Sequence, residues 1–257
     1  MRLLALALCA LTFSPVGAAT PPKPAAPSRD APSQDAPKLV EPVLRLPASH
    51  LGEIRVALTF DACEGATDTR ILDALIVHDI PATIFVTGRW LARNADAFAR
   101  MRARPDLFEI EDHGARHLPA IGYPTRVFGL KAAGSPQAVL QEVSGGAAAI
   151  TAAGGAAPHW FRGATAKYDA SAMEEIHGLG LKIAGYSLSG DGGATFSQIK
   201  TAHQIRSAHD GDVILSHINQ PTHAAGAGVV DAVIAMQAQG VVFVRLEDAF
   251  GPTDPPP

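Results

Sequence analysis

Short apolar stretches alternate along this chain with stretches in which apolar residues recur every three or four positions. The first pattern is typical of a strand buried on both faces, and the second is typical of a helix that packs on a sheet. IRVALTF at residues 54–60 predicts such a strand, and DTRILDALIVHD at residues 68–79 predicts a helix. Because the alternation continues to about residue 250, the chain predicts one α/β domain with parallel strands over residues 46–250.

The same patterns predict six further strands and five further helices. The strands are expected at residues 81–88, 107–112, 159–163, 181–188, 212–217 and 241–247. The helices are expected at residues 89–105, 135–150, 169–178, 196–209 and 222–240. Ser135 and Asp169 are the expected N-caps of two of these helices. About seven parallel strands in roughly 200 residues indicate a barrel-like α/β fold, in which the chemistry lies at the carboxyl ends of the strands.

Both ends of the chain are expected to lie outside this domain. A short positive start, an apolar stretch over residues 3–13 and small residues before Thr20 are typical of a signal peptide. We therefore expect residues 1–19 to be removed on export to the periplasm or the medium. Residues 20–45, rich in Pro and Ala, predict an extended linker, and residues 251–257 predict a disordered tail.

Charge and cysteine content narrow the class of protein further. A formal net charge of −4 over 257 residues, without a cluster of basic residues, argues against a nucleic-acid binder. No stretch after the signal peptide has 18 consecutive apolar residues, so we expect no membrane-spanning segment. Cys63 is the one cysteine outside the signal peptide, which excludes an internal disulfide in the exported chain. We expect a soluble monomer.

Polar side chains follow five of the expected strands. They are Asp61, the pair His113 and His117, Arg162, Asp191 and His217. The two histidines of the pair are four residues apart, a spacing that on a helical turn would place both imidazoles on one face, where they can bind one metal ion. Two surface histidines are the alternative for this pair, and an N-cap of the following helix is the alternative for Asp61.

The motifs at these strand ends resemble those of the NodB-homology polysaccharide deacetylases. TFDA, HGARH, WFRG and GDVILSH, followed by QGVVFVRLED, stand in the order and spacing of that family over residues 54–247. The resemblance implies a distorted (β/α) barrel and one bound divalent metal ion, commonly zinc. It also implies an exported hydrolase that removes acetyl groups from an N-acetylated polysaccharide or from peptidoglycan, acting on carbon–nitrogen bonds other than peptide bonds.

The resemblance assigns roles to five of these residues. By similarity, Asp61 is the general base and His217 is the general acid. His113 and His117 match the two histidine metal ligands, and Arg162 matches the arginine that orients the base. These residue types suit amide hydrolysis, which needs an activated water, a polarised carbonyl group and a proton for the leaving amine.

Three further residues complete the expected site. Asp191 is the candidate acid that favours the imidazolium form of His217. Leu215 would line the pocket for the acetyl methyl group. Thr165 stands where the family usually has a tyrosine, and its backbone N–H would donate to the oxyanion.

The first motif departs from the family pattern at one metal ligand. Ala62 stands where the family usually has a second aspartate, the third metal ligand. Three answers stay open: Asp61 itself binds the metal, Glu64 or Asp112 reaches into the site, or water fills the position. Cys63 is a further candidate ligand, the alternative being that it is a small buried apolar residue.

Two other functions compete with the deacetylase. A non-catalytic glycan-binding relative with a decayed metal site is favoured by Ala62. The presence of Asp61, His113, His117, Arg162 and His217 together argues against a decayed metal site. A hydrolase of another carbon–nitrogen amide bond, such as a small cyclic or formyl amide, is the second competitor, and the signal peptide argues against it.

Overall fold

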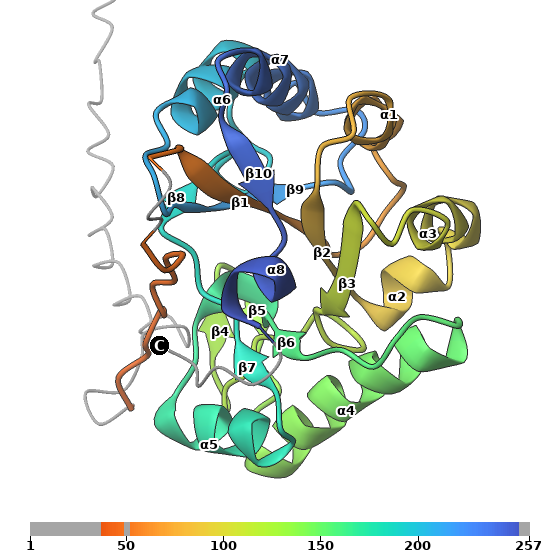
Figure 1. Ribbon diagram of the computed structural model, residues 1–257. Coiled ribbons are helices and arrows are strands. Elements are labelled where there is room, and N and C mark those ends of the chain that lie inside the picture. The colour runs from red at the N-terminus through yellow and green to blue at the C-terminus, as the bar shows by residue number, and fades with distance from the viewer. Residues whose placement is uncertain (1–36, 49–51, 252–257) are drawn as a thin grey trace, which may run out of the picture. The chain divides into compact units, whose positions relative to one another are not determined.

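A curled sheet of eight parallel strands forms the centre of the domain (Figure 1). The computed structural model describes residues 37–48 and 52–251. The strand order is β7-β6-β3-β2-β1-β9-β8, and β10 pairs with the first residues of β1. This is the distorted (β/α) barrel predicted from the sequence. The expected signal peptide, most of the expected linker and all of the expected tail except Gly251 lie outside the described residues.

The predicted strands and helices are largely present. The strands of the curled sheet are β1 (Arg55–Ala62), β2 (Ala82–Val86), β3 (Phe108–Asp112), β6 (Trp160–Phe161), β7 (Lys182–Ile183), β8 (Leu188–Ser189), β9 (Val213–His217) and β10 (Val242–Val244). The helices are α1 (Thr69–Val77), α2 (Gly88–Leu91), α3 (Ala95–Arg102), α4 (Pro136–Ala152), α5 (Ala170–Gly178), α6 (Gln198–Arg206), α7 (Ala225–Ala238) and α8 (Leu246–Phe250). A small antiparallel hairpin, β4 (Arg126–Val127) and β5 (Leu130–Lys131), was not predicted.

Side chains alternate between the two faces of β1. Leu58, Phe60 and Ala62 face outward and pack in the main core between the sheet and its helices. Thr59 and Asp61 lie between them and face the interior of the barrel, where both reach Arg162. The alternation is the ordinary period of two of a strand. It therefore decides which residues of β1 can take part in chemistry.

The helices begin where capping side chains allow it. The Ser135 side chain accepts a hydrogen bond from the backbone N–H of Ala138, and the Asp169 side chain accepts one from Ala172. Both caps were predicted. The long helix predicted at 89–105 is wrong, since it divides into α2 and α3. Asn94 stands at the break, and its side chain bonds to Thr67 and Gly65 of the loop after β1.

The single strand predicted at 181–188 is also wrong. Its residues form β7 and β8, which lie at opposite ends of the strand order, so the barrel does not close. The chain crosses the open side between them. Gly185 lies in this crossing, and a Cβ atom there would lie 2.1 Å from the backbone oxygen of Pro42.

Residues before β1 cover this open side. Val40 pairs with Tyr168, and Arg45 pairs with Asp212 on the other flank. Leu44 is only 2% exposed and lies in the inner core beside Phe85. The predicted linker of residues 20–45 therefore ends too late, because its last residues fill a gap that an incomplete barrel leaves. Among the described residues, no helix is long and apolar enough to cross a membrane.

Candidate active site

The carboxyl ends of β1, β3, β6 and β9 bring the candidate residues together. Asp61 on β1 is directly opposite His217 on β9 in the strand register. On its other side, Asp61 is opposite Phe85 of β2. The third strand along, β3, ends at Asp112, so that His113 follows at the same edge. Parallel register thus gathers residues that are far apart in the sequence.

Asp61 is a buried carboxylate held in its ionised form. It is 5% exposed, and its Oδ1 accepts a hydrogen bond of 3.1 Å from Nη1 of Arg162. Its Oδ2 lies 3.7 Å from Nε2 of His113. Burial alone would raise the pKa of Asp61, but the positive charges of His113, Arg162 and His217 outweigh it and hold the pKa below its ordinary value.

Arg162 is fully buried and fixed by contacts on every side. Besides Asp61, its Nη1 donates to Thr59 Oγ1 at 2.9 Å. Nε and Nη2 donate to the backbone oxygens of Ala184 and Gly185, at 3.2 and 3.0 Å, in the crossing between β7 and β8. The guanidinium also lies 4.2 Å from the centroid of the Phe85 ring. Arg162 therefore holds Asp61 in one position and one charge state.

His113 and His117 lie in a loop after β3, and the helical turn expected for them is wrong. Their ring centroids are 5.0 Å apart, and His117 has a left-handed φ of 63°. Glu142 on α4 holds the loop, because its Oε1 accepts from the backbone N–H groups of Arg116 and Leu118, at 2.8 and 3.0 Å. The two imidazoles thus converge through loop geometry that a spacing of four residues does not reveal.

The Nδ1 atom of His113 bonds to the backbone oxygen of Arg162, which turns Nε2 toward the site. Burial lowers the pKa of His113, but the negative groups of Asp61 and Cys63 dominate and raise it to about 9. Histidine ligands in metal sites commonly donate their second ring N–H to a carbonyl oxygen in this way.

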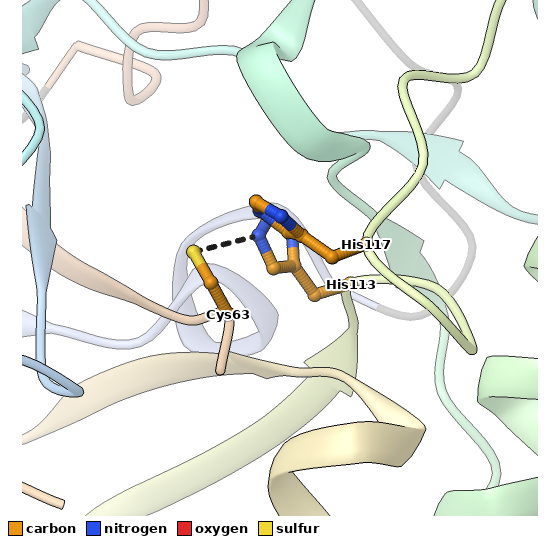
Figure 2. Close-up of side chains that lie close together, drawn as sticks. All are labelled: Cys63, His113 and His117. Carbon is orange, nitrogen blue, oxygen red and sulfur yellow. Dashed lines mark hydrogen bonds between the residues drawn. The ribbon is translucent and has the colours of Figure 1, made fainter. Parts of the chain in front are cut away.

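Cys63 joins the two histidines at the end of β1. Its Sγ lies 3.4 Å from Nε2 of His113, and the possible ligand atoms of Cys63, His113 and His117 all lie within 4.8 Å of one another. Figure 2 shows the three side chains pointing toward a common centre. Burial opposes ionisation of the thiol, but His113 and hydrogen bonds with His117 and His217 lower the pKa of Cys63 well below its usual value. Imidazole and thiolate are ligands that suit a divalent metal such as zinc.

The other candidate third ligands are engaged elsewhere. Glu64 forms an ion pair with Arg89 at the surface. Asp112 is fully buried, and its Oδ1 accepts from the backbone N–H of Gly114 at 2.8 Å. Burial raises the pKa of Asp112 well above its ordinary value, so this carboxyl group favours its neutral form. Neither side chain belongs to a group of possible metal ligands among the described residues.

His217 and Asp191 form the second fixed pair of the site. Nδ1 of His217 lies 3.0 Å from Oδ1 of Asp191, and the backbone N–H of His217 donates to Oδ2 at 2.6 Å. Burial lowers the pKa of His217, but the hydrogen bond and the charge of Asp191 raise it well above its ordinary value. The structure thus places Asp191 where the sequence analysis expected a partner for this histidine.

Leu215 and Thr165 are the two remaining residues expected in the site. Leu215 is opposite Thr59 in the register and 7% exposed, so it faces the barrel interior two residues before His217. Thr165 lies in a 3-10 turn over Ala164–Ala166 with a left-handed φ of 72°. Its Oγ1 is buried and has no hydrogen-bond partner. Tyr168 holds this turn by accepting from the backbone N–H of Gly163 at 2.8 Å.

Sequence analysis missed the residues that position the site. Glu142 and Phe85 make their contacts over long sequence separations, and no local pattern marks them or Tyr168. Cys63 could have been found more directly, because continuing the alternation of β1 by two residues beyond Asp61 places it on the inner face.

The fold and this group of residues define an α/β barrel domain with a hydrolase-type site at the carboxyl edge of its sheet. The chain belongs to the polysaccharide deacetylase family, whose sequence model matches residues 49–184. The resemblance stated from the motifs is therefore confirmed. A comparison with curated protein sequences finds no match.

Solved structures of related proteins share this fold. A peptidoglycan N-acetylglucosamine deacetylase is 18% identical, covers 81% of this chain and 92% of its own, and gives a TM-score of 0.66. A family 4 acetyl xylan esterase from Clostridium thermocellum, in complex with a cobalt ion, is 23% identical, covers 76% and 90%, and gives 0.61. A family 4 pseudoenzyme from Bacillus anthracis is 18% identical, covers 78% and 66%, and gives 0.60.

Proposed function

We propose that this protein is a metal-dependent deacetylase that removes acetyl groups from an N-acetylated polysaccharide or peptidoglycan. One observation carries the proposal: Asp61 and His217 are opposite each other in the register of β1 and β9, and each is paired with a buried group of opposite charge, Arg162 and Asp191 respectively. Arg162 accounts for the ionised carboxylate, and Asp191 accounts for the protonated imidazole. A base and an acid fixed in this way are what amide hydrolysis requires.

The side chains supply most of the proposed chemistry. Asp61 accepts a proton from the water that attacks the acetyl carbon. His217 donates a proton to the nitrogen as the carbon–nitrogen bond breaks, which releases acetate and the free amine. The backbone N–H of Thr165 would donate to the oxyanion, and Leu215 would contact the methyl group. A divalent ion at the Cys63, His113 and His117 group would polarise the carbonyl and make the water more acidic.

Family membership and the named relatives support the substrate class. One similar structure is a peptidoglycan deacetylase, and another is an acetyl xylan esterase with a cobalt ion. Zinc is the proposed metal, because two imidazoles and a thiolate form a donor set that zinc commonly accepts.

The proposal is tested on the purified protein. Metal content is measured by elemental analysis, and acetate release is measured on N-acetylglucosamine oligomers and on peptidoglycan. We expect one divalent ion per chain and acetate from at least one glycan, both lost with a chelator. A metal-free protein that releases no acetate from any of these glycans would refute the proposal that the protein is a deacetylase.

A non-catalytic glycan-binding protein is the second candidate. It is favoured by Ala62, which cannot bind metal, and a family 4 pseudoenzyme with the same fold exists. Glycan binding in the absence of both metal and acetate release would support this candidate. Glycan binding that accompanies acetate release would exclude it.

We further propose that the protein is exported and acts as a monomer. The proposal is supported by the signal-like pattern of residues 1–19. Cell fractionation with amino-terminal sequencing of the mature protein tests export, and sedimentation analysis tests the oligomeric state. An intact Met1 on a cytoplasmic protein would contradict the first statement.

A further inference from the structure

The thiol of Cys63 lies where a third metal ligand is needed. We infer that the Cys63 thiolate is the third protein ligand of the site, in place of a carboxylate, and that Asp61 is thereby left free to act as base. The inference rests on the proposed function only in taking the site to hold a divalent metal ion.

In this chain β1 turns Ala62 away from the two histidines. β1 continues through Ala62, which is opposite Val86 of β2. Ala62 is fully buried on the outer face, in the same core as Phe60 and Trp90. In this chain the methyl group of Ala62 lies in that apolar core and not beside the histidines. The next inward-facing position after Asp61 is therefore residue 63.

The backbone beyond β1 is fixed so that Cys63 turns back into the site. The backbone N–H of Thr87 donates to the oxygen of Ala62 at 3.3 Å, and the hydroxyl of Thr87 donates to the backbone oxygen of Cys63. Thr87 is itself fully buried and caps α2. The position of the thiol is therefore imposed by the fold rather than by a flexible loop.

The spacing of the Cys63 and His113 donor atoms fits two ligands of a tetrahedral metal site. Zinc lies about 2.3 Å from a thiolate sulfur and about 2.0–2.1 Å from an imidazole nitrogen, so two such ligands at a tetrahedral angle are about 3.6 Å apart. The Cys63 Sγ to His113 Nε2 distance is 3.4 Å. The bond from His113 Nδ1 to the backbone oxygen of Arg162 keeps Nε2 as the donor atom on this side.

The nearby carboxylates are not part of the group of converging ligand atoms, which among the described residues consists of Cys63, His113 and His117. Asp61 is bound through Oδ1 to Arg162, Glu64 is paired with Arg89, and Asp112 is bound to the Gly114 N–H. A thiolate ligand therefore resolves the double demand on Asp61: the metal is held by one sulfur and two nitrogens, and the carboxylate keeps the proton-accepting role.

Cobalt(II) substitution tests the inference through absorption rather than activity. The experiment uses the full chain with the substitution Cys9→Ser, so that Cys63 is its single thiol. We expect one cobalt ion per chain and a near-ultraviolet sulfur-to-cobalt charge-transfer band. Cys63→Ser should remove the band and weaken metal binding by more than about 100-fold, beyond the 10–100-fold effect of outer contacts.

Two further variants control for folding and for position. Cys63→Asp restores an anionic donor, so it should recover cobalt binding without the charge-transfer band. Ala62→Asp combined with Cys63→Ser should not recover binding, because residue 62 faces the core. Circular dichroism of each variant shows whether it is folded.

Three results would overturn the inference. They are the lack of any bound cobalt, cobalt bound without the charge-transfer band, and unchanged metal affinity in a folded Cys63→Ser. Failure of the deacetylase proposal is a separate outcome: the band would be present and the metal held, but no glycan would release acetate.

Discussion

Asp61 and His217 are neighbours that the protein holds in opposite charge states. The guanidinium of Arg162 lies 3.1 Å from Asp61 Oδ1, and the carboxylate of Asp191 lies 3.0 Å from His217 Nδ1. Each of the two side chains thus has a buried counter-charge of its own. This separates the acid from the base by environment, since a shared proton would leave neither able to act.

Asp61→Asn is expected to abolish acetate release while leaving bound metal unchanged. The amide cannot accept a proton, and loss of a general base costs about 10²–10⁴-fold in rate. Turnover and metal content are measured on the same sample. The exposed Asp73→Asn is the matched control and should keep both. Loss of metal in Asp61→Asn would instead make Asp61 a ligand.

Arg162→Met is expected to destabilise the fold by at least about 3 kcal/mol. The change leaves Asp61 buried without its partner, and it leaves the backbone oxygens of Ala184 and Gly185 without their donor. Urea unfolding measures the effect. Arg93→Met, at an exposed position, should change stability by less than about 0.5 kcal/mol. Similar losses in both variants would contradict the structural role of Arg162.

At the scale of elements, α4 supports the loop that carries the two histidines. Glu142 binds the backbone of this loop, and Gly146 allows a close approach four residues later. A Cβ atom at residue 146 would lie 2.0 Å from Asp112 Oδ1 and 2.7 Å from the carbonyl carbon of Gly114. The position of His113 therefore depends on a helix that contributes no ligand.

Gly146→Ala is expected to weaken metal binding and to destabilise the protein by about 1–3 kcal/mol, the usual cost of overpacking. The added methyl group must push the loop or the helix aside. Gly178→Ala is the matched control, because a Cβ atom there meets nothing within 4 Å. The control should keep metal affinity and gain up to about 1 kcal/mol from helix propensity. Calorimetry and metal titration of both variants check this, and equal metal affinity in the two would refute it.

Strand β3 carries two further buried acids, Glu109 and Glu111. Burial raises the pKa of Glu109. Burial and the charge of Glu109 raise the pKa of Glu111 well above the ordinary 4.5. The folded state therefore binds protons that the unfolded state has already released. The resulting stability is present at low pH and is lost as the pH rises from about 4.5 through the folded-state pKa values.

Glu109→Gln is expected to raise stability at pH 8 by about 1 kcal/mol and to leave it nearly unchanged at pH 4. The amide oxygen can still accept from Thr83 and from the backbone of Glu247, and the amide N–H₂ can donate to Glu111. Melting temperatures from pH 4 to pH 8 measure the difference. The exposed Glu53→Gln should leave the profile unchanged. A Glu109→Gln profile parallel to that of the wild type would contradict the shifted pKa values.

Local patterns predicted most elements, since burial and helix periodicity are properties of short segments. They failed where position depends on distant contacts. The stretch 181–188 reads as one strand, but Gly185 meets the backbone of Pro42, and the chain crosses between sheet edges. The two histidines were expected on a helical turn, but Glu142 holds them in a loop. The sequence predicted which residues stand at the strand ends of the site. It did not predict which other side chains hold those residues in position.

At the scale of the whole domain, the open side of the barrel is covered by the segment that precedes β1. Leu44 fills the open side between β7 and β8, and Arg45 forms a 2.8 Å ion pair with Asp212. The family match begins at residue 49, after this segment. The covering segment therefore lies outside the matched residues, although its Leu44 belongs to the buried core.

Leu44→Ala is expected to cost about 2–5 kcal/mol, as for other buried leucines. Val43→Ala provides the neighbouring control, since Val43 is 72% exposed and should change stability by less than about 0.5 kcal/mol. Chemical unfolding of the two variants decides the matter. Equal stabilities would mean that the segment lies on the surface without supporting the barrel.

The continuation of β1 through Ala62 has a consequence for how relatives should be grouped. A search for two adjacent aspartates would class this chain with family members that lack the third metal ligand. The residue two positions after Asp61 is nevertheless a cysteine that points toward His113. Sequences should instead be sorted by the residue that the strand period turns inward. By that criterion, the inferred thiolate ligand would place a chain with Asp-Ala-Cys apart from a chain that has apolar residues at both positions.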